Sequence, residues 1–147
     1  IAMDPPKHDD QRKTVQGVVA PANLKNLEST IRTRVCTILD SLPVGETFDW
    51  VDSVSIELTT QMLATLFGFP FEERHKLTYW SDIAAAGPGM TGGDIDPGVR
   101  IKGLMECLET FTAIWHERKA NPTDGFDLIS MLQRDPNTAD MVDRPME

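Results

Sequence analysis

Apolar residues recur along the chain at intervals of three and four, the spacing that places them on one face of an α-helix. One clear stripe lies between Ala22 and Leu42, before Pro43 and Gly45. Its members are Leu24, Leu27, Ile31, Val35, Ile38 and Leu42. The pattern predicts a helix over residues 22–42 with one buried face. Because no strand pattern stands out, we expect a mainly α fold.

Further helices are predicted from the same spacing and from residues that favour helix ends. Asp4 should cap a first helix that ends near Val19, and Asp49 should cap another that ends at Gly68. Three further helices are predicted. One should start near residue 70, the next should run from 96 to about 120, and the last should cover about 126–133. The predicted inner faces are Leu77, Trp80 and Ile83 in the first of these, and Val99, Leu104, Leu108, Phe111 and Trp115 in the second. Residues 87–93 are glycine-rich and should not be helical; they could act as a hinge or as a plain connector.

Composition and charge narrow the functional classes. The 147 residues are 40% hydrophobic and 25% charged, which fits one ordinary globular domain. The net charge is −9, so a nucleic-acid partner is not expected. Residues 1–34 alone carry six basic and four acidic side chains, a local excess of two positive charges. This excess could meet an acidic protein partner, or it could simply be a solvated helix face.

The cysteines, the apolar runs and the chain ends add further expectations. Cys36 and Cys107 lack metal-ligand spacing and lie in apolar helical patterns, so we expect buried free thiols, no metal site and a cytoplasmic location. No apolar run is long enough to span a membrane. The chain opens on Ile1 and stops at Glu147 where another helix could begin. We therefore expect residues 1–147 to be a single partial domain, truncated at both ends.

Two polar residues of the first predicted helix could carry chemistry. His8 and Arg12 are four residues apart and share a helix face, where an imidazole and a forked guanidinium could hold a carboxylate. On spacing alone this signal is weak, and a solvated surface pair is the favoured interpretation.

The segment from Met3 to Arg12 resembles the Met-Asp-Pro-Pro-x-His-x-x-x-Arg start of helix C in bacterial cytochromes P450, which are haem-thiolate monooxygenases. The segment from Asp124 to Leu132 is similar to helix H of that family. The resemblance implies that the chain corresponds to helices C to H of an incomplete domain. It also implies that His8 and Arg12 contact the propionates of haem b.

Five short stretches resemble the bacterial alkane and fatty-acid terminal hydroxylases more narrowly. They are 7–9, 12–15, 48–51, 62–67 and 76–82. This resemblance implies a small hydrophobic substrate hydroxylated at its terminal carbon with O2, and electrons from a ferredoxin and an NADH-dependent ferredoxin reductase. It further implies that Lys7 and Lys13 help to dock the ferredoxin, and that Ile83 and Met90 belong to a lid over the substrate channel.

The resemblance places the catalytic centre elsewhere in the protein. The family's cysteine ligand lies in a Phe-Gly-x-Gly-x-His-x-Cys-x-Gly loop, and neither Cys36 nor Cys107 has that context. The oxygen-activating acid–threonine pair is also missing. We therefore expect no catalytic residue and no iron ligand in this chain, and no activity from the chain alone. Two alternatives stay open: a cofactor-free helical interaction module, and a cytochrome P450 that acts on a terpene or steroid.

Overall fold

The computed structural model describes residues 4–17, 19–87 and 93–143. Within these ranges the chain forms helices and connecting turns without a strand, which confirms the predicted mainly α fold. The elements are α1 Lys7–Gln16, α2 Pro21–Asn26, α3 Glu28–Asp40, the π-helical turn η1 Val51–Ile56, α4 Glu57–Phe67, the 3-10 turn η2 Phe71–Glu73, α5 His75–Ala85, α6 Pro97–Ala120 and α7 Leu128–Arg134.

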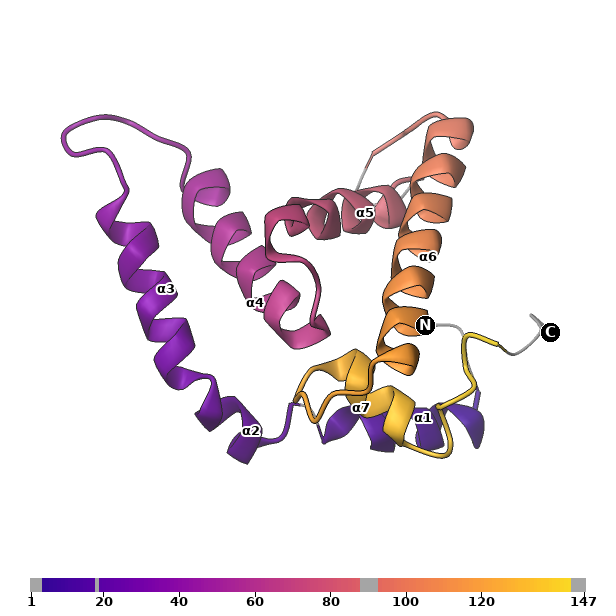
Figure 1. Ribbon diagram of the computed structural model, residues 1–147. Helices are drawn as coiled ribbons and strands as arrows, with labels where there is room; N and C mark the ends of the chain where they lie inside the picture. Colours follow the sequence, from indigo (N-terminus) through magenta and orange to yellow (C-terminus); the bar gives the residue numbers. More distant parts are fainter. Residues whose placement is uncertain (1–3, 18, 88–92, 144–147) are drawn as a thin grey trace.

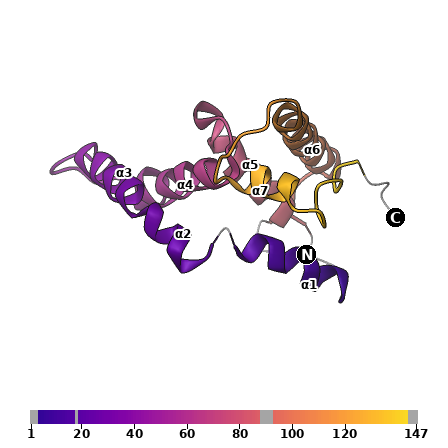
Figure 2. The ribbon, with the colours of Figure 1, turned by 60° about the horizontal axis from the view of Figure 1, so that its bottom comes forward.

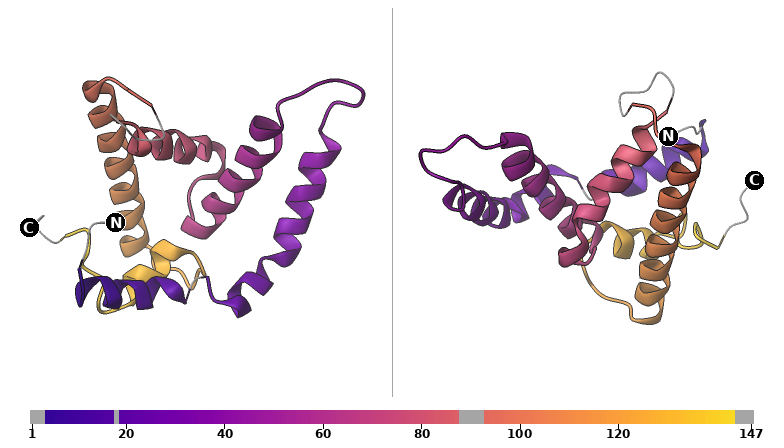
Figure 3. Two further views of the ribbon diagram at one scale, coloured as in Figure 1. Left: turned by 180° about the vertical axis from the view of Figure 1, so that it is seen from behind. Right: turned by 90° about the horizontal axis from the view of Figure 1, so that it is seen from above.

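The helices form a row in which α5 lies between α4 and α6 (Figure 1). Helix α3 packs on the other side of α4, so α3 and α6 stand at opposite ends of the molecule (Figure 3). Helix α7 lies below the row in Figure 1, where it contacts α4 and α6. Helix α1 lies against α7, as the view from below shows (Figure 2). The first and last described helices are therefore neighbours.

The core lies where α4, α5 and α6 meet. Phe69 follows α4 and is 5% exposed, and its ring packs edge-on against Trp80 of α5 at a centroid distance of 5.9 Å. Phe111 of α6 lies 5.7 Å from Phe69 and 6.1 Å from Trp80. The predicted inner face of α5 is confirmed, since Leu77, Trp80 and Ile83 are all buried.

Local capping signals set several helix ends as predicted. The Asp49 carboxylate accepts hydrogen bonds from the backbone N–H groups of Val51 (2.7 Å) and Asp52 (3.2 Å). Asp96 caps α6 in the same way. At the end of α4, Gly68 has a φ of +64°, the left-handed conformation that glycine adopts without strain.

Two helix predictions near the start of the chain are wrong in detail. Helix α1 begins at Lys7, with Pro6 at the cap position, and the Asp4 side chain makes no capping hydrogen bond. The predicted helix 22–42 is divided at Leu27, whose N–H bonds the Leu24 carbonyl in a tighter turn.

The stripe predicted to be buried is only partly covered. Ile38 is 4% exposed, but Leu24 and Ile31 are 45% and 36% exposed. On α6, Val99 and Leu108 are likewise exposed although Trp115 is buried. Periodicity identifies which side chains share a face, but it does not show that another element covers that face.

Candidate functional site

The two residues predicted to bind an anion lie on the surface of α1. The His8 side chain is 43% exposed, and its Nδ1 lies 3.1 Å from the carboxylate of Asp9. Arg12 is exposed, and its guanidinium makes no hydrogen bond or ion pair with any described residue. The structure therefore places an unpaired guanidinium one helical turn from an imidazole. This arrangement suits a carboxylate that approaches from outside the described part of the chain.

Helix α1 is held from a different side. The Thr14 hydroxyl donates a 3.1 Å hydrogen bond to the Asp135 carboxylate, which follows α7. Successive residues turn by about 100° around a helix, so Thr14 points well away from the face shared by His8 and Arg12. The contact with α7 thus leaves the His8–Arg12 face free.

The two lysines predicted to dock a ferredoxin flank this face in sequence. Lys13 is exposed and has no hydrogen-bond or ion-pair partner among the residues that the structure describes. The side chain of Lys7 lies outside the described part of the structure. Their docking role stays a prediction.

Of the two predicted lid residues, the structure describes Ile83, whereas Met90 lies outside the described residues. Ile83 is 2% exposed and packs against Gly103 of α6, so closely that a methyl group at Gly103 would overlap its Cδ1 atom. Ile83 therefore lies in the interface between α5 and α6. Its role at a substrate channel stays a prediction.

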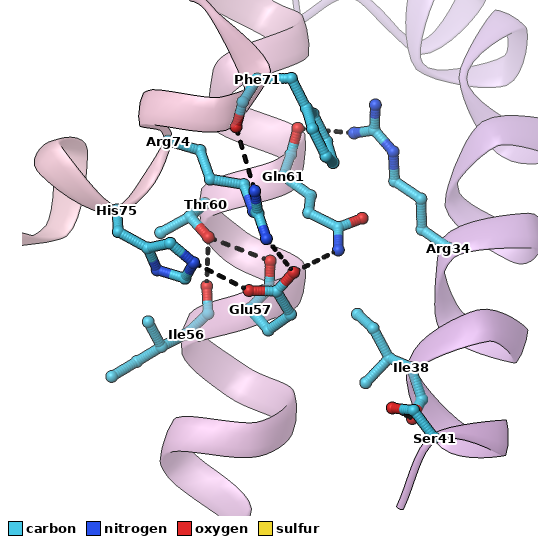
Figure 4. A network of polar contacts seen from close by, with 10 residues as sticks. All are labelled: Arg34, Ile38, Ser41, Ile56, Glu57, Thr60, Gln61, Phe71, Arg74 and His75. Carbon is cyan, nitrogen blue, oxygen red and sulfur yellow. Dashed lines mark hydrogen bonds and ion pairs between the residues drawn. The ribbon is translucent and has the colours of Figure 1, made fainter.

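A polar network between α3, α4 and α5 is a feature that we did not predict (Figure 4). The Glu57 carboxylate accepts hydrogen bonds from Gln61 Nε2 (2.6 Å) and Arg74 Nη2 (2.8 Å) through the same oxygen, Oε1. Its other oxygen lies 3.3 Å from His75 Nε2. Glu57 and Arg74 are mostly buried, with 21% and 17% of their side chains exposed. One carboxylate therefore ties the start of α5 to α4.

A second arginine extends this network to α3. Arg34 Nη1 donates to the backbone carbonyl of Gln61 at 2.5 Å. The ring of Phe71 has the Arg74 guanidinium 4.5 Å from its centroid and the Arg34 guanidinium 5.5 Å from it, distances at which cations are attracted to an aromatic ring. The two arginines thus contact the same ring, and Glu57 is the carboxylate that Arg74 binds.

The pKa values of these groups reflect their surroundings. Burial alone would raise the pKa of Glu57, but the hydrogen bonds from Gln61 and Arg74 and the positive charges of Arg74 and His75 outweigh it and lower this pKa. Burial and the nearby charge of Arg74 lower the pKa of Arg34. Glu57 is therefore held in its charged form.

The cysteines show no sign of a metal site. Cys36 is exposed, so the prediction of a buried thiol is wrong there. Cys107 is partly buried, and burial together with the charge of Glu106 raises the pKa of its thiol. Among the described residues, no three His, Cys, Asp or Glu side chains gather as metal ligands would.

None of the described helices is long and apolar enough to cross a membrane.

An apolar cavity of about 720 Å³ opens between α4, α6 and α7. Phe67, Phe111, Trp115 and Leu132 contribute to its lining. The indole N–H of Trp115 is buried without a hydrogen-bond partner among the described residues.

Comparison with known proteins identifies the family. No family model matches the chain. Among curated proteins it is similar to the steroid C26-monooxygenase of Mycolicibacterium smegmatis, with 32% identity over 132 residues, which cover 90% of this chain and 30% of the relative. It is also similar to the linalool 8-monooxygenase of Pseudomonas putida, with 30% identity over 138 residues, which cover 90% of the chain and 32% of the relative.

Solved structures give stronger similarity. Cytochrome P450-153 from Novosphingobium aromaticivorans matches with 44% identity and a TM-score of 0.78, over 94% of this chain and 32% of that one. CYP153D17 from Sphingomonas sp. PAMC 26605 matches with 40% identity and a TM-score of 0.77, over 99% of this chain and 35% of that one. The arrangement of α1 to α7 is thus that of the helical part of a haem-protein fold. The chain belongs to the cytochrome P450 family, and it spans about a third of the length of these relatives.

Membership of this family implies haem b as the cofactor. The cysteine loop that ligates the iron is not among these 147 residues. The exposed, unpaired guanidinium of Arg12 beside His8 fits the propionates of such a group, because propionates are carboxylates that need charge-assisted donors.

Proposed function

We propose that the whole protein is a cytochrome P450 monooxygenase that hydroxylates n-alkanes or fatty acids at the terminal carbon with O2. The observation that carries this proposal is the resemblance of five stretches to the alkane and fatty-acid terminal hydroxylases. The identity of 44% and 40% to two P450-153 structures, above the 32% and 30% to the steroid and linalool monooxygenases, supports a branch apart from those two enzymes. A cytoplasmic location stays a prediction.

In this proposal, His8 and Arg12 hold the haem propionates. Arg12 offers a forked pair of N–H donors, and His8 offers the ring nitrogen that does not face Asp9. When bound, the haem supplies the oxygen chemistry. The residues of this chain help to hold and position the haem. Helices α5 and α6, with Ile83 and Met90, border the substrate entrance.

The propionate role is tested by replacing Arg12 with alanine in the full-length protein. We expect less haem per polypeptide after purification, because one propionate loses a forked partner. Arg32→Ala is the matched control: Arg32 is an exposed helical arginine that forms an ion pair on the surface with Glu28 at 3.7 Å. Equal haem content in both variants would contradict the role of Arg12.

The electron donor in this proposal is an acidic ferredoxin, reduced by an NADH-dependent ferredoxin reductase. The supporting observation is the exposed Lys13 beside Arg12, in a segment with excess positive charge. Lys7→Glu with Lys13→Glu should slow reduction at low salt and flatten its dependence on ionic strength. The control is Lys25→Glu, an exposed lysine on α2. An unchanged salt dependence of the reduction rate in the double variant would rule out this docking face.

The substrate class is tested by binding measurements with full-length holoenzyme. We expect octane or dodecanoic acid to perturb the haem spectrum at lower concentration than linalool or a steroid does. Tighter binding of linalool or the steroid would favour the second candidate function, an oxygenase for terpenes or steroids. That candidate rests on the 32% and 30% identity to the steroid and linalool enzymes. A cofactor-free helical module is disfavoured by membership of the family.

A further inference from the structure

One guanidinium of the polar network between α3, α4 and α5 has a free edge. Arg34 Nη1 donates to the backbone carbonyl of Gln61 and lies 3.4 Å from the sulfur of Met62. Figure 4 shows this nitrogen turned toward α4. The opposite edge, formed by Nε and Nη2, has no hydrogen-bond partner among the described residues, and neither atom is enclosed by them. Arg34 therefore keeps a parallel pair of N–H donors open to solvent.

The positive charge of Arg34 is not matched by a carboxylate in the described part of the chain. Glu57 binds Arg74 at 2.8 Å, and Glu28 pairs with Arg32 at 3.7 Å. Burial and the charge of Arg74 both lower the pKa of Arg34, so its surroundings disfavour the charge that it carries. An anion at the free edge would offset this cost.

Three hydroxyl side chains lie beside the same guanidinium. They line an open hollow of about 260 Å³ whose lining residues are Ser29, Thr30, Thr33 and Arg34. A helical side chain extends over the turn that precedes it, so Arg34 reaches over Thr30. None of the three hydroxyls makes a hydrogen bond with a described residue, whereas Thr37, on the next turn, donates to the Thr33 carbonyl at 3.0 Å. The hollow thus combines unpaired hydroxyl donors with a free guanidinium edge.

The guanidinium is held in place from two sides. The carbonyl of Gln61 fixes its Nη1 atom, and the ring of Phe71 lies with its centroid 5.5 Å from the guanidinium carbon. A ligand at the free edge therefore meets a side chain that is already ordered, and it loses little free energy to immobilising that side chain.

We propose that Arg34, Thr30 and Thr33 form a binding site for an oxyanion of the phosphate class on the surface of α3. A phosphoryl group carries a charge of about −1.5 to −2 and three acceptor oxygens that point in different directions. Two of these oxygens match the fork of Arg34, and the third can accept from a threonine hydroxyl. A carboxylate, whose two oxygens both face the fork, would leave the hydroxyls unused. The site is distinct from the His8–Arg12 face of α1, and it depends on neither the haem nor the substrate.

The test is isothermal titration of the full-length holoenzyme with inorganic phosphate, at an ionic strength held constant with sodium chloride. We expect saturable binding of one phosphate at this site. Thr30→Val combined with Thr33→Val keeps the shape of both side chains and removes their hydroxyls, and it should weaken binding about tenfold. Thr37→Val is the matched control, because its hydroxyl already bonds the backbone, and its affinity should equal that of the unaltered protein.

A second variant and a second ligand complete the experiment. Arg34→Gln should abolish saturable binding; because it also loses the bond to the Gln61 carbonyl, the valine pair gives an answer that does not depend on this variant folding. Glycerol phosphate distinguishes the source of the anion: equal affinity indicates a phosphoryl group on a larger molecule, and binding of inorganic phosphate alone indicates the free ion. No heat of binding above the chloride baseline in the unaltered protein, or equal affinity in the valine pair, would overturn the site.

Discussion

The carboxylate of Glu57 should contribute more to stability than an exposed acidic side chain does, and Glu57→Gln tests this in the full-length protein. Glutamine keeps the shape of the side chain but has one acceptor oxygen. That oxygen can still accept from Arg74 and Gln61, as Oε1 does now at 2.8 and 2.6 Å. The new amide N–H group would then face His75 Nε2 in place of the second carboxylate oxygen, 3.3 Å away. The variant therefore loses the negative charge that faces Arg74 and His75.

The magnitude follows from burial. A hydrogen bond to a charged group contributes about 1.5–3 kcal/mol, and removing one partner of a fully buried ion pair costs about 3–5 kcal/mol. Glu57 and Arg74 retain 21% and 17% of their side-chain exposure, so water compensates part of the loss. We expect the free energy of unfolding to fall by about 2–3 kcal/mol.

The assay is urea unfolding followed by circular dichroism, with Glu109→Gln as the matched control. Glu109 is an exposed α6 carboxylate without a hydrogen-bond or ion-pair partner in the described part of the chain, so its variant should lie within about 0.5 kcal/mol of the unaltered protein. A loss at Glu57 no larger than that at Glu109 would refute the reasoning.

The same variant has a defined pH dependence. The pKa of Glu57 is lowered in the folded state, so its stabilising effect is present above its ordinary value of 4.5 and is lost as the pH falls through the lower folded value. The stability difference between the unaltered protein and Glu57→Gln should therefore be constant near pH 7 and shrink below pH 4.5. A difference that grows on acidification would contradict the sign of the shift.

Three further substitutions test local features by urea unfolding. Gly68→Ala should cost more than about 1 kcal/mol, because φ is +64° and the added carbon would lie 2.9 Å from Arg118 Nη2; a smaller loss would argue against strain there. Asp96→Ala should cost about 1 kcal/mol by removing the cap of α6, whereas an unchanged midpoint would show that the cap is unimportant. Trp80→Ala should cost about 3–5 kcal/mol because the ring is 4% exposed, while Tyr79→Ala, at 47% exposure, should cost far less; similar losses would contradict the core assignment.

Features of the fold that depend on residues close together in the sequence could be predicted from it. Asp49 and Asp96 cap the helices assigned to them because a capping side chain bonds the backbone two or three residues later. That the apolar residues of α5 share one face was also predictable, because it follows from their spacing. The exposure of Leu24 could not be predicted, because whether its helix face is covered depends on elements distant in sequence.

The candidate site shows the same division. Glu57 and Gln61 are four residues apart, a spacing that hints at contact, but Arg74 is 17 residues from Glu57 and meets it only through the packing of α5 on α4. The roles proposed for His8 and Arg12 rest on a resemblance covering the whole segment. Their spacing alone favours a solvated pair, and their exposure fits such a pair too.

The hydrogen bond between Thr14 and Asp135 has a consequence for biosynthesis, because it joins residues 121 positions apart. A contact of such high sequence separation forms late, since most of the intervening chain must first become ordered. Before the ribosome has translated the codon for Asp135, α1 has been made, but the carboxylate that binds Thr14 is not yet present. The helix that carries Arg12 should therefore be among the last to dock, and cofactor capture through it would have to wait for that step.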